Sequence, residues 1–264
     1  MLGWTHAARP ELGAVPASSL QSALETQLGI FVWFLDLGEA GSAACSKGEF
    51  GPCILINRRE APWRRNFDMA HELFHLVTWD TACVEIARDA TLGDKAEKLA
   101  NAFAAALLLP ADHVRAELKT CAREGRLALD DLVATARDFD VSTSALLWRL
   151  LNLGCGIDAG QVRGLQNDPE FQRMDRASMV GAWSDPAPLP ERFVWLAHLA
   201  SVKGRLSRTK LAQYLGCGLA DVAARLEEYG LAEVELATVL DFPCGVDSLE
   251  DLGGNHGPAA VHLA

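Results

Sequence analysis

The sequence lacks the features that mark exported and membrane proteins. No stretch of it approaches the roughly 20 uninterrupted apolar residues that a membrane span needs. The first residues, MLGWTHAARPEL, do not combine a charged start with an apolar core, as a secretory signal would. We therefore expect a cytoplasmic protein that makes no contact with a membrane.

Paired cysteines and an excess of positive charge are also missing. The seven cysteines are odd in number, widely spread and never in a C-x-x-C arrangement, which argues against a disulfide framework and a thiolate zinc site. Lysine and arginine total 24 against 35 acidic residues, so the net charge is −11. Because non-specific DNA binding needs clustered positive charge, we expect no direct DNA binding and favour a basic or neutral protein partner.

What the chain does have is apolar residues in two kinds of pattern. Half of its 264 residues are hydrophobic, enough for a sizeable core. The runs IFVWFLDL (30–37) and CILIN (53–57) are rich in β-branched and aromatic residues and predict strands, with a third short strand near residues 42–45. These strands predict a small sheet, which we expect to be antiparallel.

Helical spacing dominates the rest of the chain and predicts an α+β protein. The helix expected at 95–110 is apolar almost all round and should be buried, and Pro110 closes it. Other helices are expected over 17–28, with Ser18 or Ser19 as N-cap, over 63–79, over 111–153 up to a stop at Gly154, and over about 190–240. The expected units are a core (1–110), a helix-turn-helix-like segment (111–155), a proline-containing linker (156–190), a helical C-terminal domain (191–242) and a flexible tail (243–264).

The run AHELFHLV (70–77) carries the clearest chemical pattern. His71 and His75 lie four residues apart on the helix expected over 63–79, so both imidazoles can reach one zinc ion. Glu72 is rotated by about 100° from His71, which places it off the ion but within reach of a bound water as a general base. This pattern is typical of metal-dependent amide hydrolysis, although H-E-x-x-H also arises by chance.

A catalytic zinc site needs a third protein ligand, and Glu97 is the best candidate. It lies 22 residues after His75 in an apolar helix, where an unpaired carboxylate would be costly to bury. Asn101, one turn later, can hydrogen-bond that carboxylate and support it. Asp94 is the alternative ligand, but its place near the helix start is equally well explained as a cap.

Two segments together resemble the ImmA/IrrE family of bacterial zinc peptidases. They are RNFDMAHELFHLV (65–77) and EKLANAFAAALLLP (97–110), which match the family pattern in spacing as well as in residue type. The resemblance covers roughly residues 15–155, and LPERFVWLAHLASVKGRLSRTKLAQYLG (189–216) is similar to a helical region of some longer members. Leu99 departs from the family, where acidic residues are frequent, and this leaves Glu97 as the only glutamate of that motif.

The resemblance implies a zincin-like metallopeptidase domain and a particular kind of partner. The metal would be zinc, with manganese or another divalent ion as the alternative in vivo. Family members cleave or otherwise inactivate a helix-turn-helix (Xre-like) repressor and so induce stress-response or mobile-element genes. Here the repressor would be a separate chain. The alternative is a regulatory, antitoxin-like protein that sequesters its partner without cutting it and uses the zinc fold as a scaffold.

Some roles stay open at this point. Arg65 and His113 are candidates for substrate binding, and His113 and His198 are candidates for stabilising an oxyanion. In the helix-turn-helix-like segment the second helix offers only Arg149 among several aspartates, so we expect a scaffold rather than a DNA reader. The oligomeric state cannot be read from the sequence.

Overall fold

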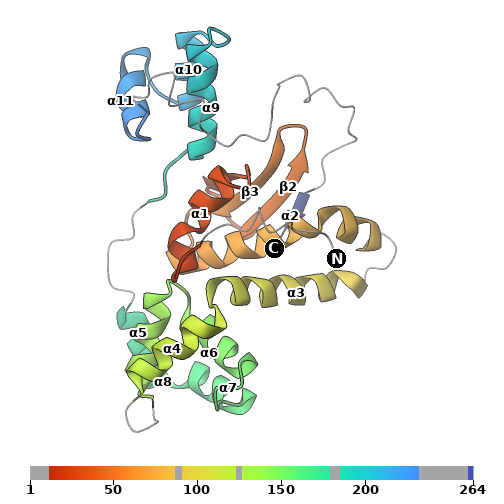
Figure 1. Ribbon diagram of the computed structural model, residues 1–264, viewed down its shortest axis with the longest axis vertical. Helices are drawn as coiled ribbons and strands as arrows, with labels where there is room; N and C mark the ends of the chain where they lie inside the picture. The colour runs from red at the N-terminus through yellow and green to blue at the C-terminus, as the bar shows by residue number, and fades with distance from the viewer. Residues whose placement is uncertain (1–11, 87–90, 123–126, 179–184, 232–260, 264) are drawn as a thin grey trace.

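The structure is a computed structural model that describes residues 12–86, 91–122, 127–178, 185–231 and 261–263. It is an α+β fold in which a small sheet and two long helices form the central part (Figure 1). Shorter helices extend from this part in two directions. One group, α4 to α8, follows α3, and the other group, α9 to α11, lies beyond the opposite side of the sheet.

The sheet is mixed, so the expectation of an antiparallel sheet was wrong. Its strands are β1 (Phe31–Leu35), β2 (Ala43–Gly48), β3 (Gly51–Asn57) and β4 (Val261–Leu263), in the order β1-β3-β2-β4. The β2–β3 hairpin is antiparallel, but β3 also pairs with β1 in parallel. Because the side chains of Ile54 and Ile56 are fully buried, β3 is the strand best suited to the centre, where it separates β1 from β2.

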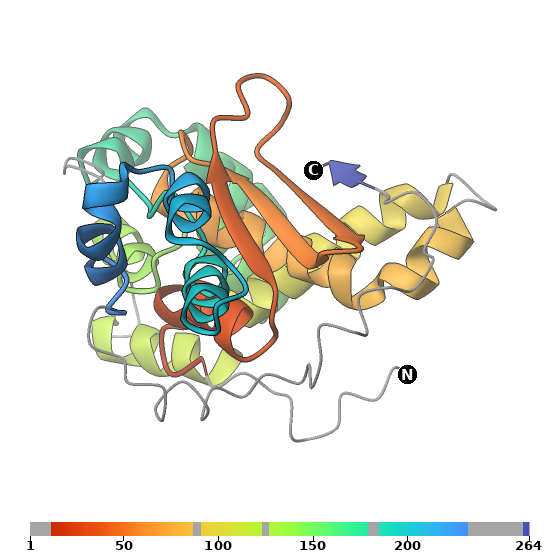
Figure 2. The same ribbon diagram turned by 90° about the horizontal axis from the view of Figure 1, so that it is seen from above.

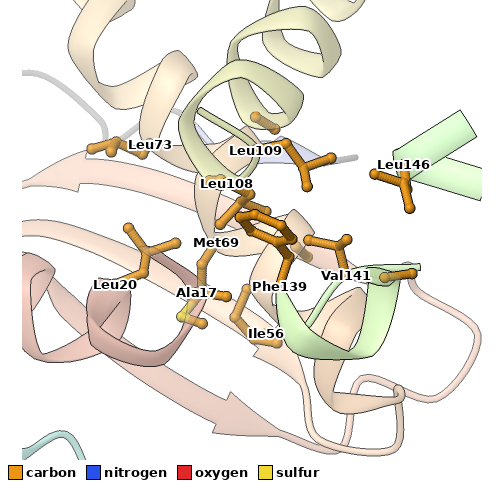
Figure 3. Close-up of a cluster of buried hydrophobic side chains, with 14 of the residues drawn as sticks. Ala17, Leu20, Ile56, Met69, Leu73, Leu108, Leu109, Phe139, Val141 and Leu146 are labelled. Carbon is orange, nitrogen blue, oxygen red and sulfur yellow. The ribbon is translucent and has the colours of Figure 1, made fainter. Parts of the chain in front are cut away.

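Two helices pack on this sheet, and a third packs beside them. Helix α2 (Pro62–Ile86) packs against β2 and β3, and α1 (Pro16–Thr26) packs against β1 and α2. Helix α3 (Thr91–Leu108) lies along α2. Figure 3 shows side chains from these helices meeting those of the sheet in one core. The predicted cap of α1 was wrong, because the helix begins with Pro16 in its first turn and has Val15 as N-cap.

Helix α3 is buried on one face only, which corrects the expectation of a helix buried all round. Ala100, Ala104 and Leu108 are fully buried, whereas Leu99 is 58% exposed and Ala102 is exposed as well. The reason is that α3 packs mainly against α2, so its other side faces outward. Alanine is tolerated in both settings, and an alanine-rich helix therefore hides which face is the exposed one.

The helix-turn-helix-like segment has the predicted outline but is not a separate body. It contains α4 (Ala111–Cys121), α5 (Leu129–Asp138) and α6 (Thr143–Asn152), and Ser142 caps α6 by accepting from the Ala145 N–H. Phe139 in the turn and Leu146 on α6 are buried in the same core as the sheet. Arg149 donates to the Leu109 carbonyl at 2.9 Å, so its side chain is engaged within the protein.

The predicted linker over 156–190 was wrong for most of its length. Helices α7 (Ala159–Asn167) and α8 (Pro169–Ser178) lie there, and they bury Val162 and Phe171 in the central core. Arg137 on α5 also forms an ion pair with Asp175 on α8. The prolines that suggested a linker follow α8 rather than interrupt it, and residues 179–184 lie outside the described residues.

The C-terminal helices α9 (Glu191–Val202), α10 (Arg208–Leu215) and α11 (Val222–Glu227), with the short 3-10 helix Leu219–Asp221, have a small core of their own. They contact the central part through α1 and β1. The Arg192 N–H donates to Glu25 at 2.9 Å, and the rings of Phe193 and Trp33 lie 5.2 Å apart. The tail predicted over 243–264 falls mostly outside the described residues, but its residues 261–263 form β4.

The sequence predicted no membrane-spanning segment and no disulfide framework, and the described part of the chain can be examined for both. None of its helices combines the length and apolarity that crossing a bilayer requires. The five cysteines described with their side chains form no disulfide bond with one another.

Candidate metal centre

Helix α2 places the two predicted histidines side by side. The Nε2 atoms of His71 and His75 lie 3.1 Å apart, and both residues are buried. Pro62 begins the helix, a position where its missing N–H has no intrahelical partner to lose. The four-residue spacing then places both imidazoles on the same side of the helix.

Glu97 of α3 places its carboxylate against both histidines. One of its carboxylate oxygens lies 3.1 Å from His71 Nε2, and the other lies 3.3 Å from His75 Nε2. Two ligands that each bind a tetrahedral zinc ion at about 2.05 Å are roughly 3.3 Å apart, so these separations have the size that one ion requires. Among the described residues, these three form the cluster whose side chains could hold a metal ion. The Glu97 side chain is 37% exposed, which is more than the sequence suggested.

Asn101 supports the site through a different partner from the predicted one. Its Oδ1 lies 3.1 Å from Nδ1 of His71, whereas a bond to Glu97 was expected. Because an amide oxygen can only accept, Nδ1 carries the proton and Nε2 is left with a lone pair for a metal. Asn101 therefore fixes the tautomer of His71 that can act as a ligand.

Glu72 is fully buried beside the cluster, and neither of its carboxylate oxygens has a hydrogen-bonding nitrogen or oxygen among the described residues. The pKa of Glu72 is raised to about 7, mainly by burial and to a smaller extent by the nearby carboxylates of Asp68 and Glu97. A hydrogen bond from the Cys45 side chain on β2 acts in the opposite direction. A buried carboxylate without such partners is costly unless water or a cation completes its surroundings, so these residues fit a metal site.

Cys45 is a neighbour of the cluster that no sequence pattern singled out. It is fully buried, and its place on β2 brings it beside Glu72. Only the register of the hairpin, in which Cys45 pairs with Ile54, determines this contact. The sequence contains no signal for that register.

Asp68 and Arg65, two further charged residues of α2, form contacts that hold the fold together. Asp68 is buried, which raises its pKa to about 6, and it forms an ion pair with Arg64 at 3.0 Å. Arg65, a candidate for substrate binding, is buried with its guanidinium 5.7 Å from the centre of the Phe34 ring. This position indicates that Arg65 packs α2 against the sheet.

The other candidates do not join the cluster. Asp94 is exposed in the first turn of α3, as expected of an acidic residue near a helix N-terminus. His113 is exposed on α4. His198 lies on α9, and burial lowers its pKa below the usual value for histidine. Among the described side chains, these positions identify no residue that would stabilise an oxyanion.

A cavity of about 630 Å³ opens next to the cluster, on the side where Asn101 lies. Trp63 and Phe67 of α2 line it together with Trp148 of α6, so one wall is aromatic. Lys98 of α3 is also part of the lining. Asn101 is common to the cavity and to the metal site, which makes the two neighbours.

The fold and the cluster together define an α+β domain with a three-residue metal site, an arrangement that metallopeptidases use. Residues 25–151 match the family model of the IrrE N-terminal-like domain (Peptidase_M78), and this part of the chain belongs to that family. The resemblance noted in the sequence is thereby confirmed.

Two curated relatives extend the comparison. A protein named radiation response metalloprotease IrrE from Deinococcus deserti is 33% identical over 141 residues, which cover 52% of this chain and 48% of the relative. The protein of the same name from Deinococcus radiodurans is 31% identical over 147 residues, covering 53% of this chain and 42% of the relative. The chain thus matches about half the length of these relatives. No solved structure gives a significant match.

Proposed function

We propose that this chain is a zinc-dependent endopeptidase in which His71, His75 and Glu97 bind the metal and Glu72 acts as the general base. The observation that carries the proposal is the cluster of His71, His75 and Glu97, whose ligand atoms approach one another to 3.1–3.3 Å, next to the buried carboxylate of Glu72. The family match of residues 25–151 and the names of the two relatives support it.

Each residue has a defined task in this proposal. Zinc, when bound, polarises the scissile carbonyl and acidifies a water molecule. Glu72 accepts the proton of that water as it attacks and delivers it to the departing amide nitrogen. A pKa near 7 before metal binding suits a group that must both take up and release a proton. Asn101 holds His71 in the tautomer that leaves Nε2 available.

The proposed substrate is an extended segment of a partner protein that adds as a strand to the sheet beside the metal site. Strand addition presents a peptide bond to a shallow cleft and needs no deep pocket. Strand β2 is the suitable acceptor, because the side chain of its residue Cys45 reaches Glu72. The aromatic cavity next to Asn101 can then receive one side chain of the bound segment.

We further propose that the partner is a helix-turn-helix (Xre-like) repressor and that its inactivation induces stress-response genes. We propose the cytoplasm as the compartment of the reaction. The net charge of −11 fits a basic or neutral protein better than DNA. Arg149, the one cation of α6, donates from Nε to the Leu109 carbonyl, and this contact favours a structural role over a contact with phosphate. The term radiation response in the names of the relatives supports a stress role.

The experiment compares wild-type protein with Glu72→Gln in the presence of the repressor encoded nearest to this chain. The variant should bind zinc and the repressor as wild type does, while cleavage falls by a factor of at least about 1,000. The matched control is His71→Ala, which should lose both zinc and cleavage. If Glu72→Gln still relieves repression in cells, sequestration without cleavage is the function. Metal analysis that finds no stoichiometric divalent ion would rule out the zinc site itself.

A further inference from the structure

The edge of β2 that faces away from β3 is already paired with a segment of the same chain. Residues 261–263 form β4, which runs antiparallel to β2 and occupies the end of the sheet. The register pairs Ala44 with Leu263, Cys45 with His262 and Ser46 with Val261. Figure 2 shows β4 well apart from α9 to α11, on the side of the molecule where α2 and α3 extend.

This edge is also the one nearest to Glu72. Helix α2 packs against β2, and Cys45, the middle residue of the β4 pairing, sends its side chain to Glu72. A strand paired with Cys45 therefore lies beside the part of α2 that carries His71 and Glu72. A peptide that binds to this edge and β4 cannot both use the backbone groups of residues 44–46.

The described pairing joins three residues of β4 to three residues of β2. A strand gains its stability from the number of its backbone hydrogen bonds, so a peptide that forms more of them with this edge than β4 does can replace it.

We propose that residues 261–263 are an internal competitor that occupies the strand-acceptor edge of β2 and must leave before an extended peptide can bind there. The proposal rests on the function proposed above, because it assigns this edge to the substrate. A segment tethered to its own binding site competes at a millimolar effective concentration, which a free peptide at micromolar concentration cannot match. The chain would thereby be held in a state of low activity until a partner supplies a longer or better strand.

The first test measures the pairing itself, in a Cys53→Ser background because Cys53 pairs with Ser46 across the hairpin and would capture a new thiol. Two cysteines introduced as Ser46→Cys and Val261→Cys lie opposite each other and should form a disulfide in high yield under mild oxidation. The off-register control is Ser46→Cys with Leu263→Cys. These positions are two residues apart along the strand, beyond the reach of about 7 Å, and should not join. Equal yields in the two variants would overturn the proposal.

The second test measures competition without relying on catalysis. The probe is the peptide PAACHLA, which corresponds to residues 258–264 with cysteine in place of Val261, activated as a mixed disulfide with thionitrobenzoate. The cysteine introduced at position 46 attacks this disulfide, forms a bond with the peptide and releases thionitrobenzoate. Release should be roughly tenfold faster when His262→Pro is added than when His262→Ala is added, because proline removes a backbone N–H from β4 and alanine keeps it.

The outcomes separate this proposal from the proposed function. Equal capture rates for the proline and alanine variants would show that β4 does not compete for the edge, whatever the enzymatic activity. Faster capture in the proline variant, in a protein that cleaves no repressor, would disprove the peptidase and leave the competing strand established. Faster capture together with faster repressor cleavage by His262→Pro supports both.

Discussion

Asn101 and His71 come from different helices, and Oδ1 of Asn101 lies 3.1 Å from Nδ1 of His71. This contact connects the exposed side of α3 to a buried histidine that we propose as a metal ligand. Removal of the amide in Asn101→Ala frees the imidazole to rotate and to change tautomer. Loss of such a supporting contact lowers metal affinity by about 10 to 100-fold. Competition with a chromophoric chelator measures this affinity.

The matched control for this prediction is Asn101→Asp. Aspartate keeps an acceptor oxygen at nearly the same place, so the zinc affinity should stay within a few-fold of the wild-type value or rise. An unchanged affinity in Asn101→Ala would mean that packing alone orients His71, and the role given to the amide would be wrong.

Metal removal should destabilise the chain, because the ligands join two helices. His71 and His75 belong to α2 and Glu97 belongs to α3. An ion present at about 1,000 times its dissociation constant stabilises the folded state by about 4 kcal/mol. A chelator should therefore lower the melting temperature by roughly 10 °C, measured by calorimetry with zinc added back as the reversal.

A variant without the ligands tests whether the effect belongs to this site. In the double variant His71→Ala with His75→Ala, chelator and zinc should leave the melting temperature unchanged. A chelator response that persisted in this variant would place the stabilising metal somewhere else in the chain.

The site was more predictable from the sequence than the sheet around it. Periodicity along one helix determines that His71 and His75 share a face, and the three-ligand requirement of zinc then identifies Glu97. Strand pairing is a contact between distant segments, so nothing local required β3 to lie between β1 and β2. For the same reason β4, more than 200 residues after its partner strand, could not be predicted.

Polar contacts between elements were also missed, and for a related reason. Asn101 was assigned to Glu97, its neighbour on the same helix, because sequence spacing reveals only contacts within a helix. The structure connects it to His71, 30 residues earlier. The two helices of the predicted linker were missed because the prolines at 186–190 suggested irregular chain, although α7 and α8 precede them.

Phe139 connects the helix-turn-helix-like segment to the central core of the sheet, α2 and α3, and its loss should destabilise both together. The ring is buried among side chains of the sheet and of α3 (Figure 3). Phe139→Ala should cost about 3 to 5 kcal/mol in free energy of unfolding. Urea unfolding should show this loss in one transition when followed by tryptophan fluorescence and by far-ultraviolet circular dichroism.

Phe50 provides the control of the same residue type. It is 88% exposed on the β2–β3 turn, so Phe50→Ala should change the free energy of unfolding by less than about 0.5 kcal/mol. If Phe139→Ala produced two separate transitions, residues 111–155 would be an independent domain instead of part of one core.

Glu25 makes the stability of the chain depend on pH where the C-terminal helices join α1. Its side chain is fully buried, and Oε2 accepts from the Arg192 N–H at the start of α9. Burial raises the pKa of Glu25 from 4.5 to about 7, and the backbone hydrogen bond from Arg192 opposes this shift. The folded state therefore holds the proton more tightly than the unfolded state does.

The sign of the pH effect follows from this difference. A carboxyl group with a raised pKa stabilises the folded chain fully below pH 4.5, and this contribution is lost as the pH rises through 7. The loss is about 3 kcal/mol at most. In Glu25→Gln the amide cannot ionise, yet its oxygen can still accept from Arg192. The melting temperature of the variant relative to wild type should therefore rise between pH 5 and pH 8.

Glu39→Gln is the control, because it makes the same substitution at an exposed position. Asp68 and Glu72 also have raised pKa values, but they are present in every variant and cancel when each is compared with wild type at the same pH. A difference between Glu25→Gln and wild type that is constant from pH 5 to pH 8 would mean that Glu25 ionises equally in the folded and unfolded chains. The contact with α9 would then be insensitive to pH.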